Sequence, residues 1–220
     1  MASPQHPAAR IAGRTLLVGL TAFAVLAALL TVVYWALHVG KSIGMHYAFD
    51  VTVVTPPEAG PDLGQGGDTD VQLSTVTVRP GDRPATAVLM EVLAVSSRYA
   101  VGLLACLTVA GAGVRLLRGR GLGRLLPSWL GGVGGLMVLV AIVEPWLRKT
   151  SVVRAVEALG LPTTPEETGL PQDAATWVVP HVWDWTDTDW FLLVLGLVAV
   201  VAAVLLHRAR RLEEDTEGLV

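Results

Sequence analysis

Charged residues are scarce in this 220-residue chain, in which Asp, Glu, Lys and Arg make up 16% and hydrophobic residues 52%. Soluble domains carry about 25% charged residues. One water-soluble core of this size would not need so many apolar side chains, so the composition indicates a membrane protein. The formal net charge is −3, and no basic face with interleaved aromatic residues is present. Direct nucleic-acid binding is therefore not expected.

Cysteine and catalytic motifs are equally scarce. Cys106 is the only cysteine, so no disulfide can form within the chain. The glycines between Gly119 and Gly123 do not form a phosphate-binding loop, because no Lys-Ser or Lys-Thr pair follows them. No serine, histidine and acid are arranged as a hydrolase would need. We therefore expect a protein that is not an enzyme and that holds no cofactor.

Four long apolar runs dominate what is present. A helix rises about 1.5 Å per residue and needs about 20 residues to cross a hydrocarbon core of roughly 30 Å. The first run, Leu16 to Val39, is too long for the apolar region of a signal peptide and lacks a cleavage site, so it predicts an uncleaved span. The predicted division of the chain is a tail (1–14), a first span (15–39), an outer loop with two short strands (40–84), a second span with an outer extension (85–117), a basic turn (118–124), a third span (125–147), an outer segment with a short helix (148–187), a fourth span (188–207) and a second tail (208–220).

Arginines predict the orientation of these spans. Positive residues in short flanking segments stay in the cytoplasm. The segment between the second and third runs carries Arg115, Arg118, Arg120 and Arg124. With four spans, the arginines near both ends of the chain fall on the same side, at positions 10, 14, 208, 210 and 211. The sequence thus predicts a multi-pass protein of the cell membrane with both termini in the cytoplasm.

The segments on the opposite side favour a small β-containing cap. Tyr47 to Thr55 and Val71 to Arg79 are β-branched and partly alternating, so each predicts a strand. Residues 56–70 between them are rich in Pro, Gly and acids and predict a loop. Residues 151–159 predict a short amphipathic helix, and residues 161–180 predict a loop. The expected fold class is an all-α membrane protein, a four-transmembrane-helix bundle with a small β-hairpin-containing extracytoplasmic cap.

Two pairs of residues are candidates for contacts inside the bundle. A charge at mid-membrane costs at least about 2.5–3.5 kcal/mol, so Arg98 and Glu144 are predicted either to form an ion pair, which Glu91 could join, or to reach the outer headgroups separately. Gly131 and Gly135 have the spacing of a small-xxx-small pair, which lets a neighbouring helix approach closely.

Two acidic segments were weighed as metal sites. His181, Asp184, Asp187 and Asp189 are possible ligands, but their spacing fits no closed tetrahedral pattern and a solvated, Trp-anchored loop explains them equally well. The acids among the glycines lack the ligand order and the terminal Glu of a calcium loop, at positions Asp62, Asp68 and Asp70. No metal is expected at either place.

The end of the chain carries a family resemblance. From Arg208 to Val220 it resembles the bacterial membrane-protein family called domain of unknown function 2975, whose tail is charged and ends in an acid followed by small and aliphatic residues. The matching positions are Leu212, Asp215, Glu217, Gly218, Leu219 and Val220, whereas Ala209 stands where a glycine is usual. The resemblance implies four spans with a basic, glycine-containing turn. Members are similar to proteins often encoded beside a small helix-turn-helix regulator, which implies a sensing or regulatory role.

The favoured function is a non-enzymatic regulatory or sensor component that lies in the lipid bilayer and acts through a cytoplasmic regulator protein. Its candidate partner or lipid-binding face consists of Arg115, Arg118, Arg120 and Arg124 with the tail acids Glu213, Glu214, Asp215 and Glu217. The alternative is a small transporter or an accessory subunit of a membrane complex. A transporter needs polar residues facing a midplane cavity, and the first, third and fourth apolar runs have almost none.

Overall fold

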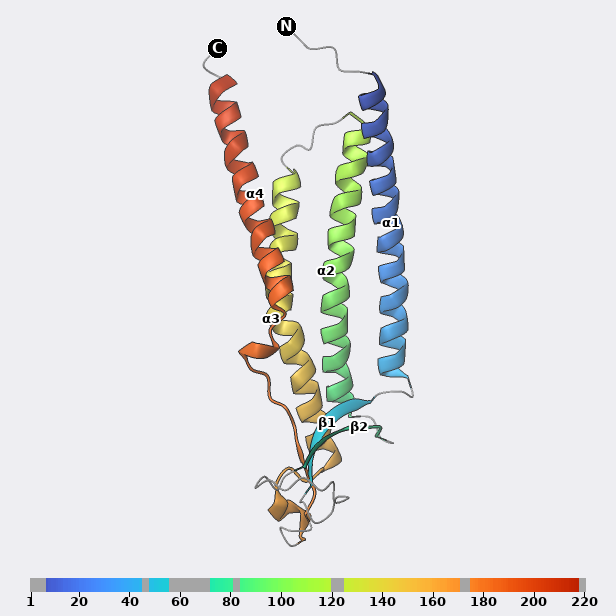
Figure 1. The fold of residues 1–220 in the computed structure, drawn as a ribbon, viewed down its shortest axis with the longest axis vertical. Coiled ribbons are helices and arrows are strands. Elements are labelled where there is room, and N and C mark those ends of the chain that lie inside the picture. The colour runs from blue at the N-terminus through green and yellow to red at the C-terminus, as the bar shows by residue number, and fades with distance from the viewer. Residues whose placement is uncertain are drawn as a thin grey trace, which may run out of the picture. The chain divides into compact units, whose positions relative to one another are not determined.

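The computed structural model describes residues 7–44, 48–55, 72–80, 84–119, 125–170 and 175–217, without the side chains of 7–12, 72–73, 125 and 213–217. Its long helices are α1 (Pro7–Ile43), α2 (Ala85–Leu117), α3 (Leu125–Leu159) and α4 (Trp190–Glu217), drawn in Figure 1. In the described residues, these four helices are each long and apolar enough to cross a membrane. The fold is that of a multi-pass membrane protein, as the sequence predicted.

The chain forms two compact units. The first unit comprises Met1–Leu37, Ser96–Val143 and Asp189–Val220, and the second comprises His38–Val95 and Glu144–Thr188. Both α2 and α3 therefore run without a break from one unit into the other, since α2 passes from Val95 to Ser96 and α3 from Val143 to Glu144.

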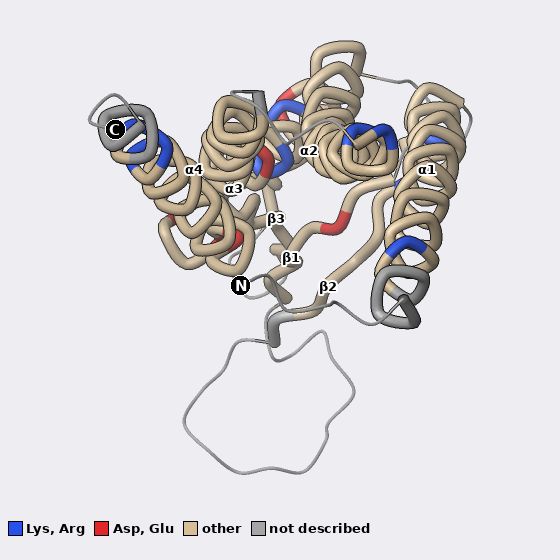
Figure 2. Tube along the Cα trace, turned by 90° about the horizontal axis from the view of Figure 1, so that it is seen from above, with Lys and Arg blue, Asp and Glu red and all other residues tan. Residues whose placement is uncertain are grey.

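The first unit is held together by small residues. Its buried side chains include Ala24, Ala28, Ala110, Ala141 and Ala203. Large apolar residues on the same helices are exposed, and Leu16 and Phe191 reach 76% and 80%. Contacts at glycines join α1 to α2, α2 to α3 and α3 to α4, and Figure 2 shows the helices in that order. In lipid, close packing of small residues replaces the hydrophobic effect between helices, so the exposed leucines and valines face acyl chains.

The second unit has a conventional hydrophobic core around a small sheet. Its strands are β1 (Phe49–Thr55), β2 (Gln72–Val78) and β3 (Trp177–Val179), in the order β2-β1-β3 with both pairs antiparallel. Alternate residues of β1 point to one face, which places Phe49 and Val51 in the core. The core is completed by Val178 of β3 and by residues on the segments of α2 and α3 that belong to this unit, namely Ala87, Ala155 and Val156.

Helix α3 differs from its prediction. A span over 125–147 and a separate helix over 151–159 were expected, yet α3 continues to Leu159 with Pro145 inside it. Proline has no N–H, so the carbonyl of Ala141, four residues earlier, would lose its partner. The backbone N–H of Asp189 donates to that carbonyl over 3.1 Å. The freed carbonyl is thereby satisfied, and the helix continues past the proline.

Other bounds were predicted more closely. The observed α2 coincides with the predicted 85–117, and it is followed by Gly119, whose φ of 67° is the left-handed conformation common after helices. Helix α1 begins earlier than the predicted 15–39, and α4 extends the predicted 188–207 to Glu217. Strand β3 lies in a segment predicted as loop, because three residues give too short a pattern to detect. The loop at 56–70 lies outside the described residues.

Candidate functional site

A polar cavity of about 610 Å³ lies within the second unit. Residues of β1, β2, α2 and α3 line it, together with the chain after β3. Its charged and polar lining includes Asp50, Glu91, Arg148, Lys149, Ser151 and His181. Both signs of charge therefore meet in one cavity, which suits a small solute that itself carries both.

Glu91 is the acid of this cavity with the weakest partner. Ser151, which is 2% exposed, donates its hydroxyl to the carbonyl of Arg148 over 2.8 Å, whereas its oxygen is 3.5 Å from the Glu91 carboxylate. A hydroxyl has one proton, so the shorter bond takes it for most of the time. In the described part of the chain, Glu91 forms no ion pair. Its carboxylate is thus available to a cationic group in the cavity.

The basic side chains of the cavity are held in place by acids that do not line it. Arg148 donates to Glu144 one helical turn earlier, over 2.6 Å. Lys149 and His181 both approach Asp187, at 3.4 Å and 3.5 Å. These pairs orient Arg148, Lys149 and His181, all of which line the cavity. Such an arrangement can bind a carboxylate or phosphate opposite the Glu91 carboxylate.

Arg98 and Glu144, the candidates for a membrane ion pair, belong to different units, and each pairs within its own unit. Arg98 lies 3.7 Å from Asp189, and Glu144 pairs with Arg148. Asp189 also accepts a hydrogen bond from the N–H of Leu192 at 3.0 Å and so caps α4. The spacing of Glu144 and Arg148 along one helix face was a signal in the sequence that could have identified this pair.

Of the two glycines of α3 that were predicted to pack against a neighbouring helix, one lies against α4 and the other does not. Gly131 lies beside Ala203 of α4, but a Cβ at Gly135 would meet nothing within 4 Å. The closest approach is instead between Gly134 and Gly196, where an added Cβ would lie 2.7 Å from the partner's carbonyl oxygen. Gly131 and Gly134 are three residues apart, share a helix face and both lie against α4.

The basic turn is described only in part. Arg115 lines an apolar groove between α2 and α3, and Arg118 is exposed. Arg120 and Arg124 lie outside the described residues. The tail acids Glu213, Glu214, Asp215 and Glu217 belong to α4, but their side chains also lie outside the described residues. The predicted face can therefore be followed at Arg115 and Arg118 alone.

The acids weighed as metal ligands have other roles where they are described. Asp184 accepts hydrogen bonds from the hydroxyl and the N–H of Thr186. Both bonds lower the pKa of its carboxyl, and the bond from the hydroxyl has the larger effect. Asp187 pairs with Lys149 and His181, and Asp189 caps α4. Among the described residues, no group of three or more His, Cys, Asp or Glu could hold a metal ion. Asp62, Asp68 and Asp70 lie outside them.

Comparison of the chain with protein-family models, with curated proteins and with solved structures finds no match. The fold itself defines the class: a multi-pass membrane protein of four apolar helices with a small three-stranded antiparallel sheet.

Proposed function

We propose that this protein is a non-enzymatic membrane sensor. Its second unit lies outside the cytoplasm and binds a small polar solute, and its basic turn and helical tail meet a regulator protein in the cytoplasm. The observation that carries the proposal is the sharing of two helices between the cavity and the membrane spans. Glu91 lies on α2 and Arg148 on α3, and both helices continue as spans to the two ends of the basic turn.

The length of these helices supports the proposal. With 33 residues in α2 and 35 in α3, each is about 50 Å long, which exceeds a hydrocarbon core of roughly 30 Å. A solute held between Glu91 and Arg148 favours one spacing of the two helices over others. A ligand shifts an equilibrium only by such differential binding, and continuous helices are suitable elements to convey it.

Charge supports the orientation of the sensor. The arginines of the turn and of both ends of the chain fall on one side of four spans, and such clusters stay in the cytoplasm. The resemblance of the tail to domain of unknown function 2975, with its neighbouring regulators, supports a cytoplasmic protein partner.

Co-purification tests whether a cytoplasmic regulator protein binds this chain. The full chain and a variant truncated before Arg208 are extracted from native membranes with a mild detergent, and the co-purifying proteins are compared. We expect a regulator protein with the full chain and its loss on truncation. A matched variant truncated after Leu212 removes the tail acids but keeps Arg208, Arg210 and Arg211, and so separates the contribution of the tail acids from that of the tail arginines. Recovery of the same proteins with all three chains would contradict the proposal.

Thermal unfolding tests whether the cavity binds solutes that carry both signs of charge. Zwitterionic solutes such as amino acids are added to the purified full chain and to Glu91→Gln and Glu157→Gln variants. Glu157 serves as the control because it pairs with Arg154 and does not line this cavity. We expect stabilisation of the unchanged chain and of Glu157→Gln but not of Glu91→Gln. Equal responses of all three chains would exclude the cavity as the binding site.

A further inference from the structure

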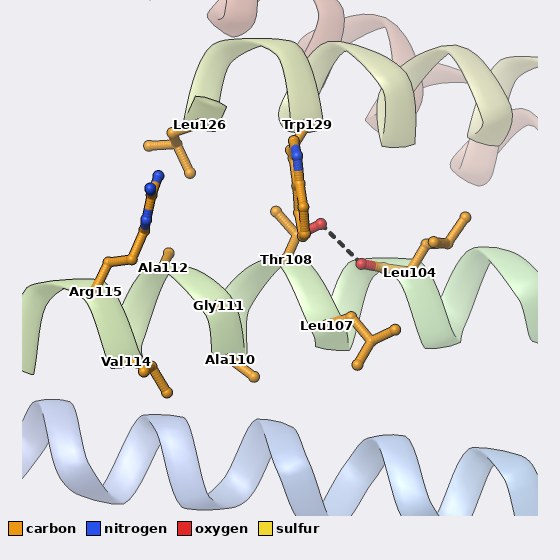
Figure 3. Close-up of a pocket in the computed structure, with 10 residues that line it drawn as sticks. All are labelled: Leu104, Leu107, Thr108, Ala110, Gly111, Ala112, Val114, Arg115, Leu126 and Trp129. Carbon is orange, nitrogen blue, oxygen red and sulfur yellow. Dashed lines mark hydrogen bonds between the residues drawn. The ribbon is translucent and has the colours of Figure 1, made fainter. Parts of the chain in front are cut away.

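The first unit contains an apolar groove of about 600 Å³ between α2 and α3, beside the basic turn. Figure 3 shows Trp129 of α3 above Thr108 and Gly111 of α2, while Arg115 extends towards Leu126. Gly111 faces Trp129, and an added Cβ there would make an ordinary contact 3.8 Å from the indole ring. Leu104 and Leu107, further along the groove, are more than two-fifths exposed and open it to the surrounding lipid.

Among the residues that the structure describes, one charge of the groove has no ion-pair partner. The hydroxyl of Thr108 donates to the carbonyl of Leu104 over 2.8 Å, so it is satisfied by its own helix. Arg115 is half-buried at the end of the groove next to the turn. Within the described ranges, its guanidinium forms no ion pair. The groove thus combines an apolar channel with a single cation at its membrane-boundary end.

We propose that this groove binds one anionic phospholipid, with an acyl chain along Leu107 and Trp129 and the phosphate on Arg115. A half-buried cation next to hydrocarbon is costly unless an anion pairs with it. The planar guanidinium can bind two phosphate oxygens at once. Free phosphate would leave the apolar channel uncovered, whereas a phospholipid supplies both the anion and the chain. The site does not depend on the proposed sensor function.

Lipid retention measured by native mass spectrometry tests the proposal. The full chain is released from nanodiscs containing equal amounts of phosphatidylglycerol and phosphatidylethanolamine. We expect retention of one phosphatidylglycerol in preference to phosphatidylethanolamine. Arg115→Gln should weaken retention about fivefold, the factor that corresponds to roughly 1 kcal/mol for one basic residue at an anionic membrane surface.

Matched variants separate the groove from the general charge of the turn. Arg118→Gln removes the same charge from an exposed position that does not line the groove, and it should weaken retention less than twofold. Ala112→Leu fills the channel without changing charge and should reduce retention as much as Arg115→Gln. This variant keeps the test decisive if Arg115→Gln fails to fold.

Three results would overturn the proposal. They are equal losses in Arg115→Gln and Arg118→Gln, unchanged retention in Ala112→Leu, and equal retention of the two lipids by the unchanged chain. The first two would show that phospholipid associates with the surface of the turn and not with the groove, and the third would show that the groove does not select an anionic headgroup.

Discussion

The two units of this protein are held together by different kinds of packing. In the first unit the buried residues are mostly alanines, glycines and threonines, and helices touch at glycines, while many leucines and valines and both phenylalanines are exposed. In the second unit the buried residues include Phe49, Val51 and Val156, and the helix segments cover one face of a sheet. The solvent explains the contrast, because acyl chains solvate a leucine as well as another helix does, and water does not.

The different packing of the two units determines which substitutions destabilise each of them. Where apolar burial gives no gain, stability depends on how closely backbones approach, so adding atoms at a contact is the damaging change. Where burial drives folding, removing atoms is the damaging change. Substitutions of opposite kinds should therefore disrupt the two units.

The largest effect is expected from Gly196→Val in the first unit. The new Cβ would lie 2.7 Å from the carbonyl oxygen of Gly134 and 2.9 Å from the Cβ of Met137, and backbone cannot yield as a flexible side chain can. We expect a loss of about 3 kcal/mol in the free energy of unfolding, measured by denaturing-detergent titration. Gly132→Val is the control, since a Cβ there meets nothing within 4 Å. Equal losses in both variants would show that close approach at Gly196 does not hold α3 to α4.

Val156→Ala should give the next largest effect, this time in the second unit. Val156 is 1% exposed, and removing its two methyl groups loses burial and leaves a cavity, at a cost of roughly 2 kcal/mol. Native-state proteolysis of the purified chain measures the change. Val182→Ala makes the same truncation at a residue that is 70% exposed and should be nearly silent. Similar protease susceptibility in both variants would mean that Val156 is not part of a cooperative core.

Substitution at Asp189 separates two smaller contributions at the start of α4. Asp189→Ala removes the side-chain cap on Leu192 and should cost about 1 kcal/mol. Asp189→Asn keeps an acceptor oxygen and loses only the ion pair with the largely exposed Arg98, so its cost should be below about 0.5 kcal/mol. Detergent titration again gives both values. Equal losses in Asp189→Asn and Asp189→Ala would assign the main role to the ion pair, which both substitutions remove.

The smallest effect is expected from pH. The hydroxyl and then the N–H of Thr186 lower the pKa of Asp184, so this carboxylate stabilises the folded state above its unfolded pKa of about 3.9. That contribution is lost as pH falls through the lowered folded pKa. Asp184→Asn should therefore show a shallower loss of thermal stability than the unchanged chain below about pH 4. Parallel curves for the two chains would contradict this assignment.

Much of the fold could be predicted from sequence because its signals are local. Length and hydropathy fix the spans, and β-branched alternation at residues 49–55 identifies β1. What could not be predicted depends on distant partners. The continuation of α3 through Pro145 relies on a hydrogen bond from Asp189, and the choice of Gly134 over Gly135 depends on which face α4 covers.

The candidate site was predicted less well than the fold. Arg98 and Glu144 were recognised as unusual charges, but their partners, Asp189 and Arg148, follow from packing that hydropathy does not encode. The cavity around Glu91 draws residues from four elements far apart in the sequence, so no local motif marks it.

Cysteine accessibility in intact cells tests most directly the central claim that the bilayer separates the second unit from the basic turn. Single cysteines replace Val76, Val182 or Arg118, all exposed, in a chain whose Cys106 is changed to alanine. A membrane-impermeant maleimide should label positions 76 and 182 in intact cells and position 118 only after permeabilisation. Labelling of position 118 in intact cells, with positions 76 and 182 protected, would contradict the account.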